Sequence, residues 1–371
     1  MQFAFSEEQD QFRDIVRRFA TERSPATEVR RLMATEDGFD PAIWRQLTGE
    51  LGLAALQVPA EYGGAGFGMV ELGIVMEEFG RALVCAPFFS SAVLATNLVL
   101  EAGGESDRSE LLPGLADGSV RGTFALVEAD GSWEPDSVQT TAELTDGRWQ
   151  ISGSKRFVID GHTADFVLVA ARANDQLAVF RVAADAEGLT RRLSATMDPT
   201  RKLADLTFDA VKASPIGRLE GAGSAIERTL DIAAVALANE MVGGAQALLD
   251  SAVAYAKMRV QFGRTIGSFQ AIKHKCADML LDVESARSAA YCAAAALAEG
   301  DPEAPALASL AKAAASETYL QCAIDTIQIH GGIGFTWEND THLWFKRAKS
   351  SEVLLGDPAL HRERLMQRWG Y

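Results

Sequence analysis

Apolar residues recur at the spacing of an α-helix near the start of the chain. Behind Ser6, a residue type favoured at helix N-caps, one helical face is formed by Phe12, Ile15, Val16 and Phe19. A second helix is predicted where Asp40 can act as the cap and Pro41 takes the first helical position. Residues 1–118 are therefore predicted to form an N-terminal helical domain.

The pattern changes after residue 118 to short runs of β-branched or alternating residues, separated by Gly, Asp and Asn. Such runs lie at 122–128, 140–144, 148–159, 165–172, 177–182 and 202–211. Runs of this kind are typical of strands joined by turns. Residues 119–217 are therefore predicted to form a middle β domain.

The remainder of the chain, residues 218–371, is rich in alanine and returns to the helical period. Long helices are predicted near 222–258, 268–299 and 303–330. Helices, then strands, then long antiparallel helices indicate an α+β protein in three parts.

The charge balance restricts the partners that the chain can have. Its 371 residues include 51 acidic and 35 basic ones, so the net charge is −16, which argues against nucleic acid or an anionic membrane surface as a partner. The first residues are acidic where a leader peptide would be basic, and no uninterrupted apolar run reaches the ~18 residues of a membrane span. We expect a cytoplasmic protein.

The cysteines give no sign of a metal site. Their spacing matches neither a metal-ligand motif nor a redox motif, since they stand far apart at Cys85, Cys276, Cys292 and Cys322. Free thiols in a reducing compartment are the expectation, and no metal is predicted.

One charged residue, Glu240, stands inside the apolar stretch between Asp231 and Asp250. Burying a carboxylate without a partner costs several kcal/mol or more, so such a residue needs an explanation. Glu240 is either a structural accident, half of an ion pair or a residue that performs chemistry.

Three segments, taken in order, resemble a known protein family. Residues 259–263 read RVQFG and are followed by Phe269–Gln270; residues 327–350 read IQIHGGIGFTWENDTHLWFKRAKS; residues 153–165 read GSKRFVIDGHTAD. Together with the loop EYGGAGFG at 61–68, their order and spacing are similar to those of acyl-CoA dehydrogenases along essentially the whole chain.

The resemblance implies an N-terminal helical domain, a middle β-barrel or sandwich and a C-terminal four-helix bundle. FAD would bind without a Rossmann fold, between the β domain and the bundle, with its adenine end held by a neighbouring subunit. An acyl-CoA would be the substrate, and an electron-transfer flavoprotein would take the electrons. The assembly would be a homo-oligomer or a heterotetramer with a homologous subunit.

The family motifs also imply which residues contact the cofactor. Arg259 would contact the pyrophosphate and Phe262 the adenosine end, with Gln270 nearby, and an arginine suits a bidentate phosphate contact. A segment at the subunit boundary would reach the FAD of the other subunit, and it comprises Gln328, Ile329, His330, Gly331 and Gly332. Paired glycines allow backbone N–H groups to approach a diphosphate closely.

The half of the site that would face the flavin ring departs from the family pattern. Phe157 holds the place of an aromatic residue that packs on the ring, although a core role is equally open. Ser132 is kept beside Glu128, but Val127 and Ile159 replace threonines that would contact the flavin. This half is poorer in hydrogen bonds than the adenine half, as expected if the chain is one of two different subunits.

Both familiar positions for the catalytic carboxylate are apolar. The usual glutamate position after the R-A-K run is Leu355, and the alternative position on the long helix is Ala233. Glu240 lies seven residues beyond Ala233, which is ~700° of rotation and so within ~20° of the same helix face. It is the leading candidate base, and Asp357 is the alternative; Glu352 is expected to be solvated or ion-paired.

Two interpretations of Glu240 stay open at this point. It can act as the base, or it can form an ion pair with Lys273, His274 or Arg347 across the bundle. Asp357 also fits a simple helix cap followed by a proline, because it precedes Pro358.

The sequence therefore predicts an FAD-dependent acyl-CoA dehydrogenase subunit that forms a 2,3-enoyl-CoA by α-proton abstraction and β-hydride transfer to flavin. The alternative is a non-catalytic subunit that completes the FAD site of a partner dehydrogenase. The chain resembles the actinobacterial dehydrogenases that assemble as α2β2 heterotetramers and degrade steroid side chains by a form of β-oxidation.

Overall fold

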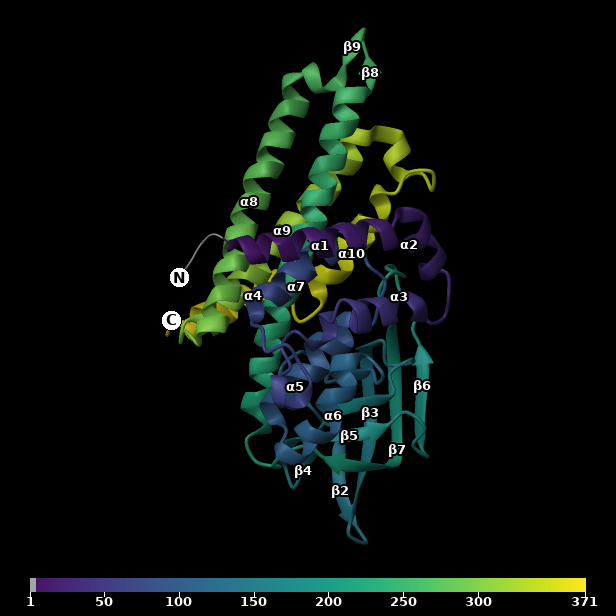
Figure 1. Cartoon of the computed structure of the whole chain (residues 1–371), viewed down its shortest axis with the longest axis vertical. Helices are drawn as coiled ribbons and strands as arrows, with labels where there is room; N and C mark the ends of the chain where they lie inside the picture. The colour runs from purple at the N-terminus through teal and green to yellow at the C-terminus, as the bar shows by residue number, and fades with distance from the viewer. Residues whose placement is uncertain (1–4) are drawn as a thin grey trace. The chain divides into compact units, whose positions relative to one another are not determined.

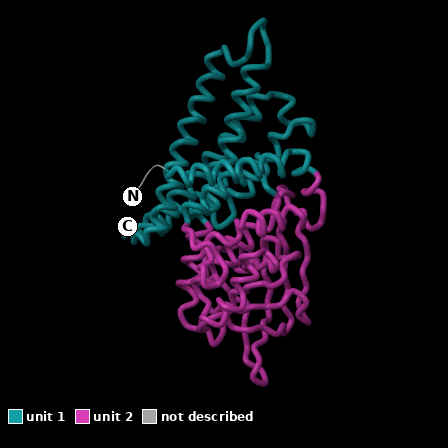
Figure 2. The backbone as a smooth tube through the Cα atoms, viewed as in Figure 1, with its two compact units in different colours: residues 1–30, 69–84, 234–371 teal, residues 31–68, 85–233 magenta. Residues whose placement is uncertain are grey.

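A computed structural model describes residues 5–371 (Figure 1). The chain divides into two compact units, each built from segments that are far apart in sequence (Figure 2). The helical unit comprises residues 1–30, 69–84 and 234–371, and the sheet unit comprises residues 31–68 and 85–233. The three domains predicted from the sequence, 1–118, 119–217 and 218–371, stay a prediction.

Long helices dominate the helical unit. They are α7 (Ala222–Met258), whose first turns belong to the sheet unit, α8 (Gln270–Glu299) and α9 (Ala304–His330), and α8 packs along α9. The N-terminal helix α1 (Glu7–Arg23) packs on α4 (Met69–Ala82), which also contacts α8. Two shorter helices, α10 (Thr341–Val353) and α11 (Pro358–Arg368), pack on α9.

Local sequence signals set the ends of these helices. Ser6 caps α1 in a capping box with Gln9, which confirms the predicted N-cap. Gly300, at φ +65°, ends α8 in the left-handed conformation that glycine adopts without a steric penalty. Between α7 and α8, a hairpin of β8 (Val260–Gln261) and β9 (Arg264–Thr265) turns back through Phe262 and Gly263, both with positive φ.

Two glycines let α4 and α7 pack with their backbones almost in contact. A Cβ atom at Gly80 would lie 1.9 Å from the Glu240 carbonyl oxygen, and one at Gly243 would lie 1.8 Å from the Glu77 carbonyl oxygen. Neither oxygen is the end of a flexible side chain that can move aside. The helix pair therefore depends on the absence of side chains at Gly80 and Gly243.

The sheet unit combines short helices with one sheet. Its helices are α3 (Pro41–Arg45), α5 (Thr96–Ala102) and α6 (Glu105–Asp117), with Asp40 and Pro41 at the start of α3 as predicted. The strands are β1 (Gly122–Ala125), β2 (Thr141–Thr145), β3 (Arg148–Ile159), β4 (Phe166–Ala173), β5 (Gln176–Ala183), β6 (Leu189–Leu193) and β7 (Leu203–Pro215).

The seven-stranded sheet closes on itself. Its order is β1-β4-β2-β3-β7-β5, and β4 also pairs with β5, so five strands form a ring, with β6 paired to β7. The interior is filled by alternating side chains such as Ile151, Val169, Phe180 and Leu206. This barrel-like sheet confirms the predicted middle β region, and β6 is the strand that the sequence patterns missed.

Helix α7 contains an 18-residue window with a mean hydropathy of 1.4, long and apolar enough to cross a membrane by composition alone. The sequence expectation concerned an uninterrupted apolar run, and α7 is interrupted by charged residues such as Asp231, Glu240 and Asp250. Of that window, 83% is buried inside the protein, so α7 serves as the core helix of the fold.

We predict that Gly243→Ala lowers the thermal unfolding temperature strongly, because the new methyl group would overlap the Glu77 carbonyl and force the helices apart. Overpacking of this kind costs about 1–3 kcal/mol, and backbone overlap places it at the upper end. The matched control is Gly223→Ala in the same helix, where a Cβ meets no atom within 4 Å. Equal melting temperatures for the two variants, measured by circular dichroism, would contradict the helix contact.

Candidate functional site

Glu240 forms a buried ion pair. Arg347 on α10 donates from Nη1 to Glu240 Oε1 at 2.8 Å, and the side chains of both residues are less than a tenth exposed. Of the three partners considered for Glu240, Arg347 is therefore the one brought to it, whereas Lys273 and His274 are exposed. Breaking such a pair by removing one member costs about 3–5 kcal/mol, since the other charge stays buried.

The loop between α10 and α11 is held by two buried basic residues. Lys312 of α9 donates from Nζ to the carbonyl oxygens of Ser351 at 3.1 Å, Glu352 at 2.7 Å and Gly356 at 2.6 Å. His361 approaches the Leu355 carbonyl with Nε2 at 3.1 Å, and because a carbonyl only accepts, this nitrogen carries the proton. Both residues satisfy acceptors left free where α10 ends.

Burial controls the charge of both residues. It lowers the pKa of Lys312 to about 7, although the nearby carboxylates of Asp357 and Glu352 favour the ammonium form. Burial, reinforced by the positive charge of Lys312, lowers the pKa of His361 to about 3. His361 is therefore a neutral hydrogen-bond donor near neutral pH.

Leu355, at the family's usual base position, is a buried apolar residue in a strained conformation. Its φ is +64°, a left-handed value that is costly for a residue with a side chain. Its side chain is buried, as is that of Ala233 at the other familiar position. Neither position offers a titratable group.

The alternative carboxylates have structural partners. Asp357 is exposed and caps α11, with Oδ1 accepting the Leu360 N–H at 2.8 Å and Pro358 in the first turn, so the cap-and-turn interpretation is confirmed. Glu352 pairs with Lys349 at 2.5 Å, as expected for an ion-paired residue. A catalytic role for Glu240 or Asp357 remains a prediction.

The predicted adenine-binding residues are displayed on the surface of the β8–β9 hairpin. Phe262 is 91% exposed at the turn, and its ring meets Phe269 edge-on at 6.2 Å. Arg259 precedes β8 and Gln270 opens α8, and both are exposed. The hairpin therefore displays an exposed aromatic ring and an exposed guanidinium group, which suit a base and a phosphate.

The second predicted segment lies at the end of α9, next to the end of α7. His330 stacks on Tyr255 at 4.3 Å, four residues before Arg259, and its Nδ1 lies 2.8 Å from the Thr326 carbonyl. His330 and Ile329 are buried and hold the helix end, whereas Gln328 is exposed.

Gly331 and Gly332 come next along the chain, at the surface, where a Cβ added to either would meet no atom within 4 Å. The backbone there is open to a ligand. Gly331 has a φ of +65°, which suits glycine.

A β-bulge positions Phe157. The pairing of β3 with β7 shifts register between Lys155 and Val158, and Phe157 sits there with φ +55° and 43% of its surface exposed. Phe157 is therefore a partly exposed residue and not part of the barrel core. Val127 and Ile159 are buried and apolar, in keeping with a flavin-facing half that is poor in hydrogen bonds.

Glu128 and the fully buried Lys155 form a second internal ion pair, with Nζ and Oε1 2.8 Å apart. Burial lowers the pKa of Lys155 to about 8, and the Glu128 carboxylate opposes this shift. Glu128 also accepts from the backbone N–H of Thr140 at 2.9 Å. The half-buried Ser132 accepts from the Glu134 N–H at 3.1 Å and so shapes the loop that contains it.

Sequence reasoning missed three buried basic residues: Lys155, Lys312 and His361. Their partners are backbone carbonyls or a distant glutamate, which no residue spacing reveals. A lysine inside a run of alanines, as in LAKAAA around Lys312, was the available signal.

Comparison with known proteins shows consecutive family matches along the chain. Residues 6–119 match the acyl-CoA dehydrogenase N-terminal domain, residues 123–211 the middle domain and residues 220–370 the C-terminal domain.

Individual relatives match over nearly their whole length. The chain is 37% identical to the acyl-CoA dehydrogenase IpdE2 of Mycobacterium tuberculosis over 358 residues, 95% of this chain and 94% of that protein. A solved variant of the Tcur3481-Tcur3483 steroid ACAD has a TM-score of 0.88 at 33% identity, with 98% of each chain covered. The ChsE4-ChsE5 complex from Mycobacterium tuberculosis has a TM-score of 0.91 at 26% identity, covering 100% of this chain and 99% of that one.

FAD is the cofactor of this class of proteins. The residues present fit its adenine diphosphate half: an exposed aromatic ring at Phe262, a guanidinium group at Arg259, and open backbone at Gly331 and Gly332.

We predict that Lys312 makes stability depend on pH. Its pKa falls from 10.5 in the unfolded chain to about 7 in the fold, so between these values the unfolded state binds one more proton and stability rises with pH. The rise is up to about 1.4 kcal/mol per pH unit. In Lys312→Met this rise is absent, so the unfolding temperature of the parent minus that of the variant increases as pH rises from about 7 to about 9.

The matched control is Lys349→Met, which removes a lysine whose side chain is 47% exposed. The difference in unfolding temperature between Lys349→Met and the parent protein should stay constant over the same pH range. Parallel pH curves for Lys312→Met and the parent would contradict the assignment of a buried, deprotonating lysine.

Proposed function

Because this chain is a member of the acyl-CoA dehydrogenase family, we propose that it is the non-catalytic partner subunit of a heteromeric, FAD-dependent acyl-CoA dehydrogenase. The reaction of the assembly is the oxidation of a CoA thioester to its 2,3-enoyl-CoA. When bound, FAD supplies the hydride acceptor for the β-hydrogen. This chain completes the cofactor site of its partner.

The observation that carries this proposal is the buried pair of Glu240 and Arg347. Abstraction of an α-proton needs a carboxylate that is free to take the proton. Taking it would discharge Glu240 and deprive the buried Arg347 guanidinium group of this carboxylate counter-charge, which costs several kcal/mol. Asp357 is committed to capping α11, and Leu355 and Ala233 cannot accept a proton.

The residues proposed to bind the FAD of a partner subunit lie, in contrast, at the surface. Arg259, Phe262, Gln270 and Gln328 are exposed on the helical unit, and Gly331 and Gly332 leave open backbone. Arg259 would hold the diphosphate and Phe262 would cover the adenine. A partner subunit is expected to bind the adenine half of FAD while its candidate bases are held in structural contacts.

Two of the similar structures are named after two components each, Tcur3481-Tcur3483 and ChsE4-ChsE5, and the first is called a steroid ACAD, an acyl-CoA dehydrogenase. This supports a heteromeric assembly for our chain and a CoA thioester of steroid origin as the substrate class. An electron-transfer flavoprotein would reoxidise the flavin.

Oxidation of the substrate by this chain itself, with Glu240 as the base, is the competing proposal. Its support is the position of Glu240 on α7, seven residues from Ala233. It requires that Arg347 releases Glu240 when substrate binds.

We predict that the chain purified alone contains far less than one FAD per chain, because apolar Val127 and Ile159 leave its own flavin-facing half poor in hydrogen bonds. Co-expression with a homologous catalytic subunit should give a yellow complex that an acyl-CoA bleaches. Phe262→Ala in this chain should then weaken the affinity of the complex for FAD roughly tenfold, since base stacking contributes about 1–3 kcal/mol. The measurement is the flavin absorbance per chain after gel filtration.

The control is Tyr371→Ala, which removes an aromatic residue of similar exposure, at 85%, outside the motif segments and the predicted cofactor residues. A chain that is yellow on its own, with flavin near one per chain and bleached by an acyl-CoA, would contradict the partner-subunit proposal.

A further inference from the structure

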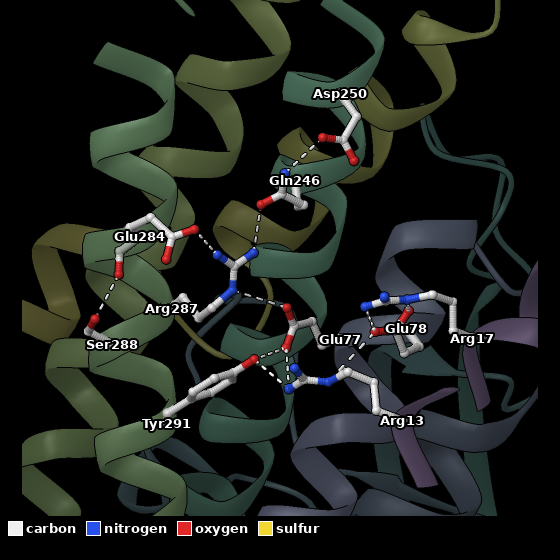
Figure 3. A network of polar contacts seen from close by, with 10 residues as sticks. All are labelled: Arg13, Arg17, Glu77, Glu78, Gln246, Asp250, Glu284, Arg287, Ser288 and Tyr291. Carbon is white, nitrogen blue, oxygen red and sulfur yellow. Dashed lines mark hydrogen bonds and ion pairs between the residues drawn. The ribbon is translucent and has the colours of Figure 1, made fainter. Parts of the chain in front are cut away.

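Four arginines meet around a small pocket in the helical unit, whose lining contains none of the residues assigned above to FAD or to proton transfer. The pocket has a volume of about 410 Å³ and is lined by residues of α1, α4, α7 and α8. Figure 3 shows its network, in which Arg13, Arg17 and Arg287 turn toward the carboxylates of Glu77 and Glu78. The fourth guanidinium group belongs to Arg81.

The carboxylates at the base of the pocket are buried and fully engaged. Arg17 binds Glu78 in a bidentate manner, with Nε–Oε2 at 3.0 Å and Nη2–Oε1 at 2.7 Å. Arg287 Nε donates to Glu77 Oε1 at 3.2 Å, and the Tyr291 hydroxyl donates a short hydrogen bond to Glu77. Burial beside Glu77 raises the pKa of Tyr291, so it stays a neutral donor.

The lining holds more positive than negative charge. Four guanidinium groups face two carboxylates, on a chain whose overall charge is −16. Two further acids, Glu284 and Asp250, pair with Arg287 and Arg81, but they lie outside the lining and are 55% and 48% exposed. Solvent screens such exposed charges, so they neutralise the pocket only weakly.

One donor in the pocket lacks an acceptor. Arg13 Nη2 donates to the Tyr291 hydroxyl at 2.7 Å, and the guanidinium group packs on the Phe5 ring at 4.2 Å. Its Nε is buried, lies 4.0 Å from Glu78 Oε1, beyond hydrogen-bonding reach, and has no hydrogen-bond partner among residues 5–371. A buried N–H without an acceptor costs about 1–3 kcal/mol, so the acids of the lining satisfy the Arg13 guanidinium group only in part.

We propose that this pocket binds a small oxyanion, a carboxylate or phosphate group of a small molecule. Guanidinium groups bind both through planar, charge-assisted hydrogen bonds. The volume lies near the lower end of the range for ligand pockets, so it suits a small acid and is too small for CoA or FAD. Binding this ligand offsets the excess positive charge of the lining.

Gln246 gives the sharpest test because it can be changed without loss of shape. It accepts from Arg287 Nη2 at 2.7 Å and donates to Asp250 at 2.9 Å, four residues along α7. Gln246→Glu keeps the acceptor for Arg287 and adds one negative charge to the lining. The matched control is Gln367→Glu on α11, since Gln367 donates to Glu363 at 3.0 Å with the same spacing of four residues.

The experiment titrates the purified full-length protein, in its native assembly, with inorganic phosphate and with glutarate by isothermal titration calorimetry, against sodium chloride of equal ionic strength. We expect saturable binding of at least one of the two, and the tighter one identifies the ligand group. Gln246→Glu should weaken this binding roughly tenfold, the size expected for one added charge at short range. Gln367→Glu should leave it within about twofold.

A second pair of variants guards against a local folding defect. Arg81→Gln removes a lining charge whose partner Asp250 is exposed, and Arg228→Gln removes an arginine paired with Glu101 that does not line this pocket. Arg81→Gln should weaken anion binding while both variants keep the parent unfolding temperature within a few degrees. The absence of saturable binding of either anion, or equal effects of Gln246→Glu and Gln367→Glu, would overturn the proposal.

Discussion

The buried ion pair between Glu240 and Arg347 joins the core helix α7 to α10. It is a constraint because neither charge can be left alone in the interior, and each therefore fixes the other. Gly80 on α4 and Gly243 on α7 bring these two helices together, and the Gly80 backbone approaches the Glu240 carbonyl. The placement of Glu240 thus depends on three helices at once.

The same constraint bears on the turn between α10 and α11. Beyond Arg347, helix α10 ends at Val353. Lys312 and His361 donate hydrogen bonds to backbone carbonyl groups around the turn that follows. Leu355, at the position where the family places its base, is buried in this turn with a left-handed backbone. The site is therefore locked by internal contacts, whereas Arg259 and Phe262 on the hairpin stay exposed. The proposal that this chain completes the FAD site of a partner subunit rests on this contrast.

The sequence predicted the elements well where periodicity and caps were strong. The helix cap at Ser6, the Asp40–Pro41 start and the helices at 222–258 and 303–330 follow from local signals, and most strands were found. Strand β6 was missed because it carries two arginines, Arg191 and Arg192, and pairs with β7 as an edge element. Its stability comes from its neighbour and not from its own pattern.

The site was predictable only in part. Motif spacing located the cofactor residues, and Arg347 was one of three partners considered for Glu240, but helix periodicity alone could not choose among them. Contacts between distant segments, such as Lys312 with the 351–356 turn or Arg13 with Tyr291, depend on helix packing that the order of residues does not specify.

The proposed role of this chain as a partner subunit depends most on Glu240 being a structural ion-pair residue. The direct measurement is the turnover of the flavin-loaded, co-expressed complex carrying Glu240→Gln, which keeps an acceptor for Arg347 and removes the base. Turnover close to that of the parent complex, at equal flavin content, is the predicted result. A loss of about 10²–10⁴-fold, the usual contribution of a general base, would contradict it and make this chain the catalytic subunit.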